Sequence, residues 1–304
     1  MRPFLIDTDT ASDDAVALLM ALRHPGVRVE AITVVAGNVP LDQGVQNALY
    51  TVELCGATTP VHAGAERPLR RPLETAQSVH GEDGMGDLGL PLAGRRPAPE
   101  AAVDVILATA ARHAGSLTLV TLGPLTNVAL ALEREPALAR QLARCVVMGG
   151  TGDGRGNVTP VAEYNIWVDP EAARRVLESG LRITLVGWDV SCASAVIDPA
   201  TAARLRGLGS ERARFAIDIQ RQVDVFARET SGLAGFDLPD PIAMAVALEP
   251  GIARTERRRV GVATGDGPDR GAILPGPLDA ESTVERVTRV PRERFLALLE
   301  AALR

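Results

Sequence analysis

Short apolar runs of the β-strand type alternate with longer helical patterns through the first two thirds of this 304-residue chain. The strand-type runs are PFLID at 3–7, RVEAITVVAG at 28–37, SLTLVTLG at 116–123, ARCVVMGG at 143–150 and RITLVGWDV at 182–190. Near-continuous apolar strands joined by helices are typical of a parallel sheet that is covered on both faces. The sequence therefore predicts an α/β fold, an open, mostly parallel central sheet with helices on both faces and a Rossmann-like core. No Gly-, Ser- or Pro-rich linker interrupts this order, so we expect a single domain over 1–304.

Composition and charge narrow the class of protein. The net charge is −6, every basic residue is arginine, and the arginines are scattered, so nucleic-acid binding is not expected. Cys55, Cys145 and Cys192 lack the spacing of metal ligands and are expected to be reduced thiols. The N-terminus reaches acidic residues too early for a secretory signal, and no apolar run approaches membrane-spanning length. We therefore expect a cytoplasmic protein with no membrane partner.

Polar or glycine-rich segments follow several of the predicted strands. They are the aspartates after PFLI, Gly37 and Asn38 after AITVVA, LGPLTN at 122–127 and MGG at 148–150. In open α/β sheets, ligands bind beyond the carboxyl ends of the strands. These segments are therefore expected to converge on one pocket.

The segment FLIDTDTASDDAVAL, at 4–18, holds four aspartates within eight positions. Ser12 is expected to cap a helix whose first turn holds Asp13 and Asp14. A helix N-terminus stabilises an anion by at most about 1 kcal/mol, which cannot neutralise four carboxylates. Because buried carboxylates need a cation, hydroxyl donors or both, the segment predicts a hard-cation site.

Two other aspartate motifs were compared with this segment. An EF-hand loop starting at Asp7 would need glycine at its sixth position and glutamate at its twelfth, where Ser12 and Leu18 stand. An aspartate-based phosphotransferase or phosphatase of the haloacid-dehalogenase type would have threonine at Ala11. The EF-hand is excluded, and the phosphotransferase is kept as an alternative.

The segment resembles the signature of the nucleoside hydrolase family, the inosine/uridine-preferring nucleoside N-ribohydrolases. The signature D-x-D-x-x-x-D-D-A-x-A-L is met from Asp7 to Leu18. Further segments resemble the family in its order: VAGN at 35–38, HGEDGMG at 80–86, TLGPLTN at 121–127, MGG at 148–150, GNVTPVAEYNIWVDPEAA at 156–173 and DPIAMA at 240–245. The resemblance covers most of the chain and implies a nucleoside hydrolase-like fold.

The resemblance implies a tightly bound Ca²⁺ at the bottom of the pocket. Its ligands would be Asp9, Asp14, Asp240 and the backbone carbonyl of Leu122. Oxygen ligands in high number suit Ca²⁺. Asp9 would also act as the general base that takes a proton from the attacking water. The implied reaction is hydrolysis of a ribonucleoside to ribose and free base, and its implied place is purine or pyrimidine salvage.

Ribose recognition is assigned by the same resemblance. The family positions match Asp13, Asn38, Asn157, Glu163 and Asn165. Each of these side chains can pair with sugar hydroxyls, so deoxyribose substrates are expected to react poorly.

The chain departs from the family where the leaving base is recognised. Many members carry a histidine directly before the late D-P, where this chain has Pro239, which cannot donate a proton. His80 is then the candidate that protonates or hydrogen-bonds the base, because an imidazole can titrate near neutral pH. Trp167, Trp188, Phe226 and Phe236 are the aromatic candidates near the base, but the sequence decides neither their direction nor the base preference.

A third function stays open beside the hydrolase and the phosphotransferase: a non-catalytic ribose- or nucleoside-binding protein on the same scaffold. This alternative stays open because Pro239 cannot donate a proton to a leaving base. Family resemblance also suggests a homo-oligomer, a dimer or a tetramer, although no stretch of the sequence identifies an interface.

Overall fold

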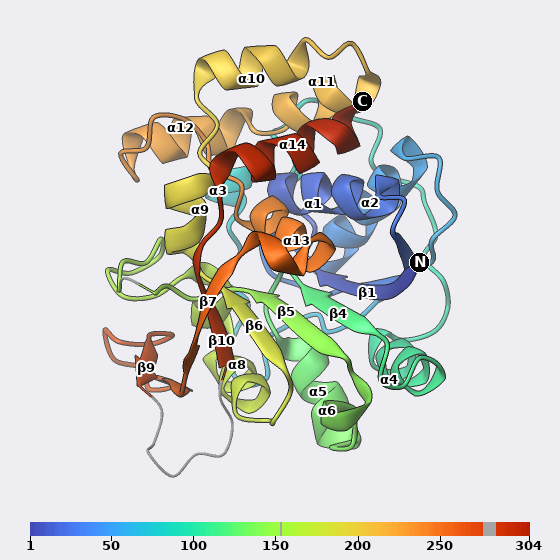
Figure 1. Ribbon diagram of the computed structural model, residues 1–304, viewed down its shortest axis with the longest axis vertical. Helices are drawn as coiled ribbons and strands as arrows, with labels where there is room; N and C mark the ends of the chain where they lie inside the picture. The colour runs from blue at the N-terminus through green and yellow to red at the C-terminus, as the bar shows by residue number, and fades with distance from the viewer. Residues whose placement is uncertain (153, 276–283) are drawn as a thin grey trace.

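An eight-stranded sheet forms the centre of the molecule in the computed structural model, which describes residues 1–152, 154–275 and 284–304. The strand order is β3-β2-β1-β4-β5-β6-β10-β7, and only the β10–β7 pair is antiparallel. This open, mostly parallel sheet confirms the predicted architecture (Figure 1). The strands are β1 Arg2–Thr8, β2 Val27–Val34, β3 Val61–Ala63, β4 Thr118–Thr121, β5 Arg144–Met148, β6 Ile183–Val186, β7 Arg254–Arg258 and β10 Val284–Arg289.

Helices cover both faces of the sheet, as Figure 1 shows. The alternation in β1 explains why, because Phe4 and Ile6 belong to one apolar core while Leu5 belongs to the other. The first core is built with α1 Ser12–Arg23, α2 Leu41–Leu54, α13 Pro239–Leu248 and α14 Arg292–Leu303. The second is built with α4 Ala102–Arg112, α5 Thr126–Arg134, α6 Leu138–Gln141 and α8 Pro170–Leu177.

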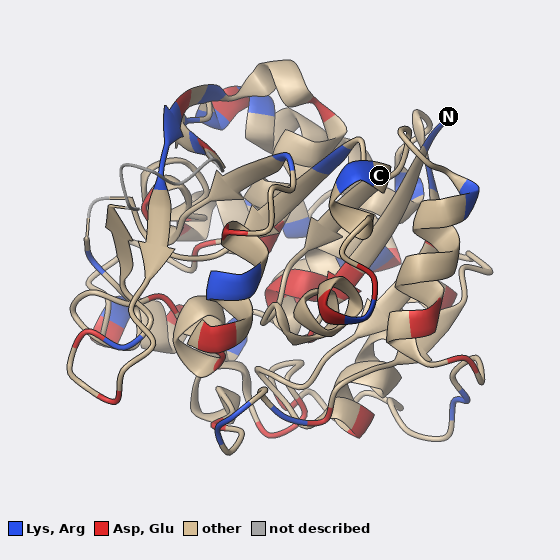
Figure 2. Cartoon of the chain, turned by 90° about the horizontal axis from the view of Figure 1, so that it is seen from below, with Lys and Arg blue, Asp and Glu red and all other residues tan. Residues whose placement is uncertain are grey.

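The remaining elements are short and lie outside the two layers of helices described above. They are α3 Gln77–His80, α7 Tyr164–Val168, α9 Trp188–Ser194, α10 Pro199–Arg206, α11 Glu211–Asp218, α12 Arg221–Glu229, a 3₁₀ turn Pro250–Ile252, and the antiparallel pair β8 Val260–Val262 and β9 Ile273–Pro275. Within the described ranges, no helix has both the length and the apolar character needed to cross a membrane. Basic and acidic residues alternate over the ribbon in Figure 2, in line with the scattered arginines of the sequence.

The start of α1 differs from the prediction. Ser12 does not cap the helix; the N-cap residue is Ala11, and the backbone N–H of Ala11 donates to Asp14 Oδ2 at 3.0 Å. Thr8 Oγ1 donates to the other oxygen of Asp14 at 2.5 Å. The helix start is therefore held by an aspartate of its first turn, and the Ser12 hydroxyl is free for another partner.

The order of the strands locates the ligand crevice. The chain runs outward from β1 to β2 and β3, then returns to continue on the other side with β4, β5 and β6. In doubly wound sheets, ligands bind at this reversal, outside the carboxyl ends of the central strands. Here the reversal falls between β1 and β4, so the segment after Thr8 faces the segment after Thr121.

Candidate active site

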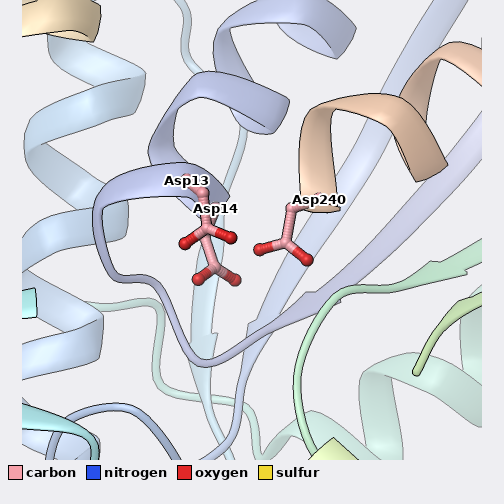
Figure 3. A group of neighbouring side chains, drawn as sticks. All are labelled: Asp13, Asp14 and Asp240. Carbon is pink, nitrogen blue, oxygen red and sulfur yellow. The ribbon is translucent and has the colours of Figure 1, made fainter. Parts of the chain in front are cut away.

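Three aspartates meet at the N-termini of two helices, as Figure 3 shows. Asp13 and Asp14 come from the first turn of α1, and Asp240 comes from the first turn of α13. Each offers a carboxylate oxygen, and the three oxygens lie within 4.8 Å of one another. All three residues are buried, so their charges have little water around them. This acidic cluster is the strongest candidate for a cation site among the described residues.

Asp9 lies close to the acidic cluster and is held by the backbone around it. A Cβ atom added to Gly37 would lie 2.1 Å from Asp9 Oδ2, and one added to Gly123 would lie 2.5 Å from Asp9 Oδ1. The backbone N–H of Asn38 donates to Oδ2 at 2.6 Å, while Oδ1 is buried without a hydrogen-bond partner. Two glycines at two strand ends therefore make the space in which the Asp9 carboxylate fits.

Burial and mutual repulsion disfavour the charged forms of these carboxyls. Burial, with the nearby charge of Asp14, raises the pKa of Asp9 well above its ordinary value, and burial with the charges of the other three aspartates does the same to the pKa of Asp240. Burial raises the pKa of Asp13 and of Asp14 to about 6. Asp13 Oδ1, like Asp9 Oδ1, is buried and accepts no hydrogen bond from the residues that the structure describes. Oxygen donors that are buried, crowded and unpaired fit a hard cation such as Ca²⁺.

The backbone carbonyl of Leu122 lies in the pocket segment that follows β4. It accepts a hydrogen bond from Asn165 Nδ2 at 2.7 Å, and Leu122 and Asn165 both line the pocket. A carbonyl oxygen has two lone pairs, so this bond leaves one acceptor position for a further partner. The sequence-predicted ligand Leu122 and the sequence-predicted sugar contact Asn165 are thus linked directly.

A pocket of about 330 Å³ opens above the acidic cluster, a volume suited to a small organic ligand. All five residues predicted to contact ribose line this pocket, as do two predicted metal ligands, whereas Asp9 and Asp14 are completely buried and do not line it. The lining members of the predicted set are Asp13, Asn38, Leu122, Asn157, Glu163, Asn165 and Asp240.

Glu163 and Asn157 are fixed by bonds to backbone N–H groups. Glu163 is the N-cap residue of α7 and accepts from Gly150 N at 2.7 Å and Asn165 N at 2.8 Å. Burial raises its pKa to about 7, although these donors oppose the shift. Asn157 Oδ1 accepts from Tyr164 N at 2.9 Å. The two side chains are therefore held at defined places on the pocket wall.

His80 lies at the end of α3 and lines the same pocket. Its Nδ1 is 3.0 Å from Ser12 Oγ and 3.8 Å from Asp13 Oδ1. Burial lowers the pKa of His80 to about 4, and the charge of Asp14 opposes this shift. Burial therefore disfavours the charged imidazolium, and the assignment of His80 to the leaving base stays a prediction. At pH 7 the ring is neutral and can act as a hydrogen-bond partner.

Apolar side chains also line the pocket. Val223, Phe226 and Ala227 of α12 line it, together with Trp188 and Pro239. Trp167 also lines the pocket, and the Arg270 guanidinium lies 3.9 Å from the centre of its ring. The structure therefore directs both tryptophans to the pocket, which the sequence left undecided.

Two polar residues of the pocket wall, Tyr164 and Asp237, were not predicted from the sequence. Tyr164 lines the pocket, and its hydroxyl donates to the backbone carbonyl of Glu74 at 2.8 Å. Asp237 is buried and lines the pocket, and its Oδ2 accepts from Trp188 Nε1 at 3.0 Å. The position of Asp237, three residues before Asp240, was the available signal.

Asp7 has a different role from the other aspartates of the signature. Its Oδ1 accepts from Thr33 Oγ1 at 2.5 Å and from Asn127 Nδ2 at 2.8 Å. Burial raises its pKa to about 7. The bonds of Asp7 connect β1 to β2 and to the start of α5, so it ties the strand ends together beside the site.

Comparison with known proteins decides the family. The sequence model described as inosine-uridine preferring nucleoside hydrolase matches residues 4–297. The chain belongs to this nucleoside hydrolase family. It is therefore an enzyme of the nucleoside hydrolase class, and the resemblance seen in its sequence is confirmed.

Relatives and solved structures agree with this membership. The pyrimidine-specific ribonucleoside hydrolase RihA of Salmonella schwarzengrund (strain CVM19633) is 40% identical over 267 residues, which cover 86% of this chain and 84% of the relative. The plant nucleoside hydrolase PpNRh1 superposes with a TM-score of 0.94 at 31% identity, covering 99% of this chain and 98% of that one. A purine-preferring ribonucleoside hydrolase from Gardnerella vaginalis superposes with a TM-score of 0.93 at 30% identity, with the same coverage. Similar proteins thus carry names with opposite base preferences.

Proposed function

We propose that this enzyme hydrolyses the N-glycosidic bond of ribonucleosides, giving ribose and free base, with one Ca²⁺ per chain and Asp9 as general base. The observation that carries the proposal is the buried acidic cluster beneath a nucleoside-sized pocket, in a chain of this family. One eight-stranded sheet contains both β1, near the start of the chain, and β10, near its end. We therefore propose that the chain acts as one domain.

The proposed ligands of the cation are the carboxylates of Asp9, Asp14 and Asp240 with the carbonyl of Leu122. The unpaired Asp9 Oδ1 and the raised pKa values of these carboxyls support a cation there, because a cation removes the cost of their burial. When bound, Ca²⁺ supplies positive charge that makes a neighbouring water more acidic. Asp13, which also reaches the cluster, is proposed to accept from a ribose hydroxyl.

Asp9 is proposed to take a proton from the attacking water. Because Oδ1 is assigned to the cation, the proton is proposed to go to the second lone pair of Oδ2, which the Asn38 N–H holds in place. The water oxygen then forms a bond to C1′ while the glycosidic bond breaks and its electron pair leaves with the base. A water positioned beside a fixed base needs little reorganisation at the moment of reaction.

The pocket is proposed to favour the transition state by its charge. Positive charge develops on the ribose ring as the glycosidic bond lengthens, and the neutral substrate lacks it. Asp13 and Asp240 line the pocket, and Glu163 lies on its wall. Carboxylates in this low-dielectric site stabilise a cationic sugar more than a neutral one.

Ribose hydroxyls are proposed to pair with Asp13, Asn38, Asn157, Glu163 and Asn165, and the base with His80. Because burial keeps His80 neutral at pH 7, we propose that it hydrogen-bonds the departing base through Nε2, the ring nitrogen that is not engaged with Ser12. A hydrogen bond from a neutral imidazole stabilises negative charge on the base without a full proton transfer.

A reducing-sugar assay on inosine, uridine, cytidine and adenosine tests the proposal directly. Release of ribose with free base supports it. Release of phosphate from nucleotides without sugar release would favour the phosphotransferase alternative. Nucleoside binding seen by calorimetry without any turnover would favour the binding-protein alternative.

A further inference from the structure

Asp237 is a buried carboxylate in the pocket that the proposed reaction does not use. Apart from the acidic cluster and Glu163, the carboxylates lining the pocket are Glu74 and Asp237. Glu74 is exposed and its side chain forms an ion pair with Arg270. Asp237 is 7% exposed and is not paired with any basic side chain in the described ranges. A buried carboxylate is costly unless it is paired or hydrogen-bonded, and because this one faces the pocket, a bound ligand can supply the missing donor.

Two donors fix the Asp237 carboxylate from one side. Trp188 Nε1 donates to Oδ2 at 3.0 Å, and Ser191 Oγ donates to the same oxygen at 2.8 Å. No hydrogen bond from the described residues reaches Oδ1. These donors favour the ionised form and oppose the effect of burial, which raises the pKa of this carboxyl. The result is a carboxylate held in one orientation with one oxygen available as an acceptor.

The chain around Asp237 turns this residue toward the pocket. Leu238 is buried, while its neighbours Asp237 and Pro239 both line the pocket. Trp188, which donates to Asp237, lines the same pocket, and so do Phe226 and Ala227 of α12. Apolar surfaces suit the faces of a planar heterocycle, and a polar group beside them suits its edge.

We propose that Asp237 is a specificity-determining residue whose Oδ1 accepts a hydrogen bond from an N–H group on the edge of the leaving base. This inference rests on the proposed function, since it concerns the base that is released. Because Trp188 and Ser191 both donate to Oδ2, the side chain presents Oδ1 as an acceptor, so a base that presents a carbonyl or a bare ring nitrogen at the same place is disfavoured. Leaving such acceptors facing each other in a buried site is the kind of mismatch that gives strong discrimination.

Two pairs of nucleosides report on this contact. Cytidine and uridine exchange donor and acceptor at both the ring nitrogen and the exocyclic position, and so do adenosine and inosine. The ratio of kcat/KM within a pair therefore measures whether the enzyme prefers a donor or an acceptor at that edge. Measuring the ratio avoids effects that act equally on both members.

The decisive variant is Asp237→Asn, which keeps the size of the side chain. Trp188 and Ser191 both donate, so they hold the amide oxygen, and the amide NH₂ takes the place of Oδ1 as a donor. We expect the kcat/KM ratio in at least one pair to shift by about tenfold or more toward the member that presents an acceptor to residue 237. Hydrolysis of p-nitrophenyl riboside, which has no base edge, should stay within about threefold of the parent enzyme. Asp42→Asn, the same change at an exposed carboxylate of α2 that does not line the pocket, should leave both ratios unchanged.

Each other result has a distinct meaning. Unchanged ratios in both pairs, or equal losses on nucleosides and p-nitrophenyl riboside, would overturn the role of Asp237. Parent enzyme that hydrolyses no substrate at all would instead contradict the proposed function, and Kd ratios for the same pairs would then still test Asp237. If Asp237→Asn does not fold, Ser191→Ala removes one donor from Oδ2 and should shift the same ratio in the same pair by a smaller factor.

Discussion

The two ends of the pocket are built in different ways. The acidic end, defined by Asp9, Asp13, Asp14 and Asp240, is set by helix N-termini and by two glycines that leave no space for a Cβ atom beside Asp9. The part that we propose faces the base, called the base end and defined by α12, Trp188, Asp237 and Pro239, is set by side chains from the later part of the chain. The backbone determines the shape of the acidic end, whereas side chains that substitution can replace determine the shape of the base end.

This difference explains how one reaction can serve several substrates. Chemistry at the acidic end tolerates little change, because moving one carboxylate disturbs its neighbours. The base end can change without affecting that geometry, which agrees with similar proteins named pyrimidine-specific and purine-preferring. We therefore expect substitutions at the acidic end to lower every activity, and substitutions at the base end to change activities selectively.

The largest effect is expected for Asp9→Asn at the acidic end. The amide cannot accept a proton, so kcat should fall by at least about 100-fold on every substrate, including p-nitrophenyl riboside. Steady-state kinetics together with metal analysis of the variant measure this. Asp42→Asn, at an exposed carboxylate of α2, is the matched control and should be neutral. Near-normal kcat in Asp9→Asn would move the general base elsewhere, most directly to Asp13.

His80→Ala is the corresponding change toward the base. Loss of one hydrogen bond to the departing base should slow inosine and uridine by about 10- to 100-fold. Hydrolysis of p-nitrophenyl riboside should change little, because its leaving group needs no such help. Equal losses on all substrates would assign His80 to positioning, through its contacts with Ser12 and Asp13.

Gly37→Ala tests whether the backbone sets the acidic end. The new Cβ would lie 2.1 Å from Asp9 Oδ2, so the carboxylate or the loop must move. We expect kcat to fall by about tenfold on all nucleosides alike, since small misplacements of a catalytic group are costly. Gly251→Ala, where a Cβ meets nothing within 4 Å, is the control. Unchanged kcat in Gly37→Ala would show that the acidic end adapts as easily as the base end.

Most of the fold and part of the site were predictable from the sequence. Apolar runs with helical connections predicted the sheet, because strands such as β1 are buried on both faces. Strand-end segments predicted that Asn38 and Leu122 line one pocket, because the sheet order brings the ends of the central strands together. The family resemblance, and not the strand pattern, predicted the other lining residues Asn157, Glu163, Asn165 and Asp240. The neutral state of His80 was not predictable, since it depends on burial by distant segments. Asp237 was missed because its donors, Trp188 and Ser191, are more than 40 positions away in the chain.

The smallest effect is expected in the stability of the acidic end as pH changes. Burial raises the pKa of Asp13 and Asp14 to about 6, so without a cation their stabilising contribution is full below about pH 4 and is lost as pH rises through about 6. We expect calcium to reverse this loss, because a bound Ca²⁺ would stabilise the deprotonated carboxylates. Calcium should therefore raise Tm by several degrees at pH 7.5 and by much less at pH 5. An equal increase at both pH values in a calorimetric scan would contradict this account of the cluster.

The central claim is that the buried carboxylates hold a Ca²⁺ on which hydrolysis depends. The most direct test is the calcium content of the purified enzyme, measured together with ribose release before chelation, after chelation and after calcium is returned. The account predicts one calcium per chain, loss of ribose release on chelation and its recovery with added calcium. An enzyme that contains no calcium and releases ribose equally well in chelator would contradict it.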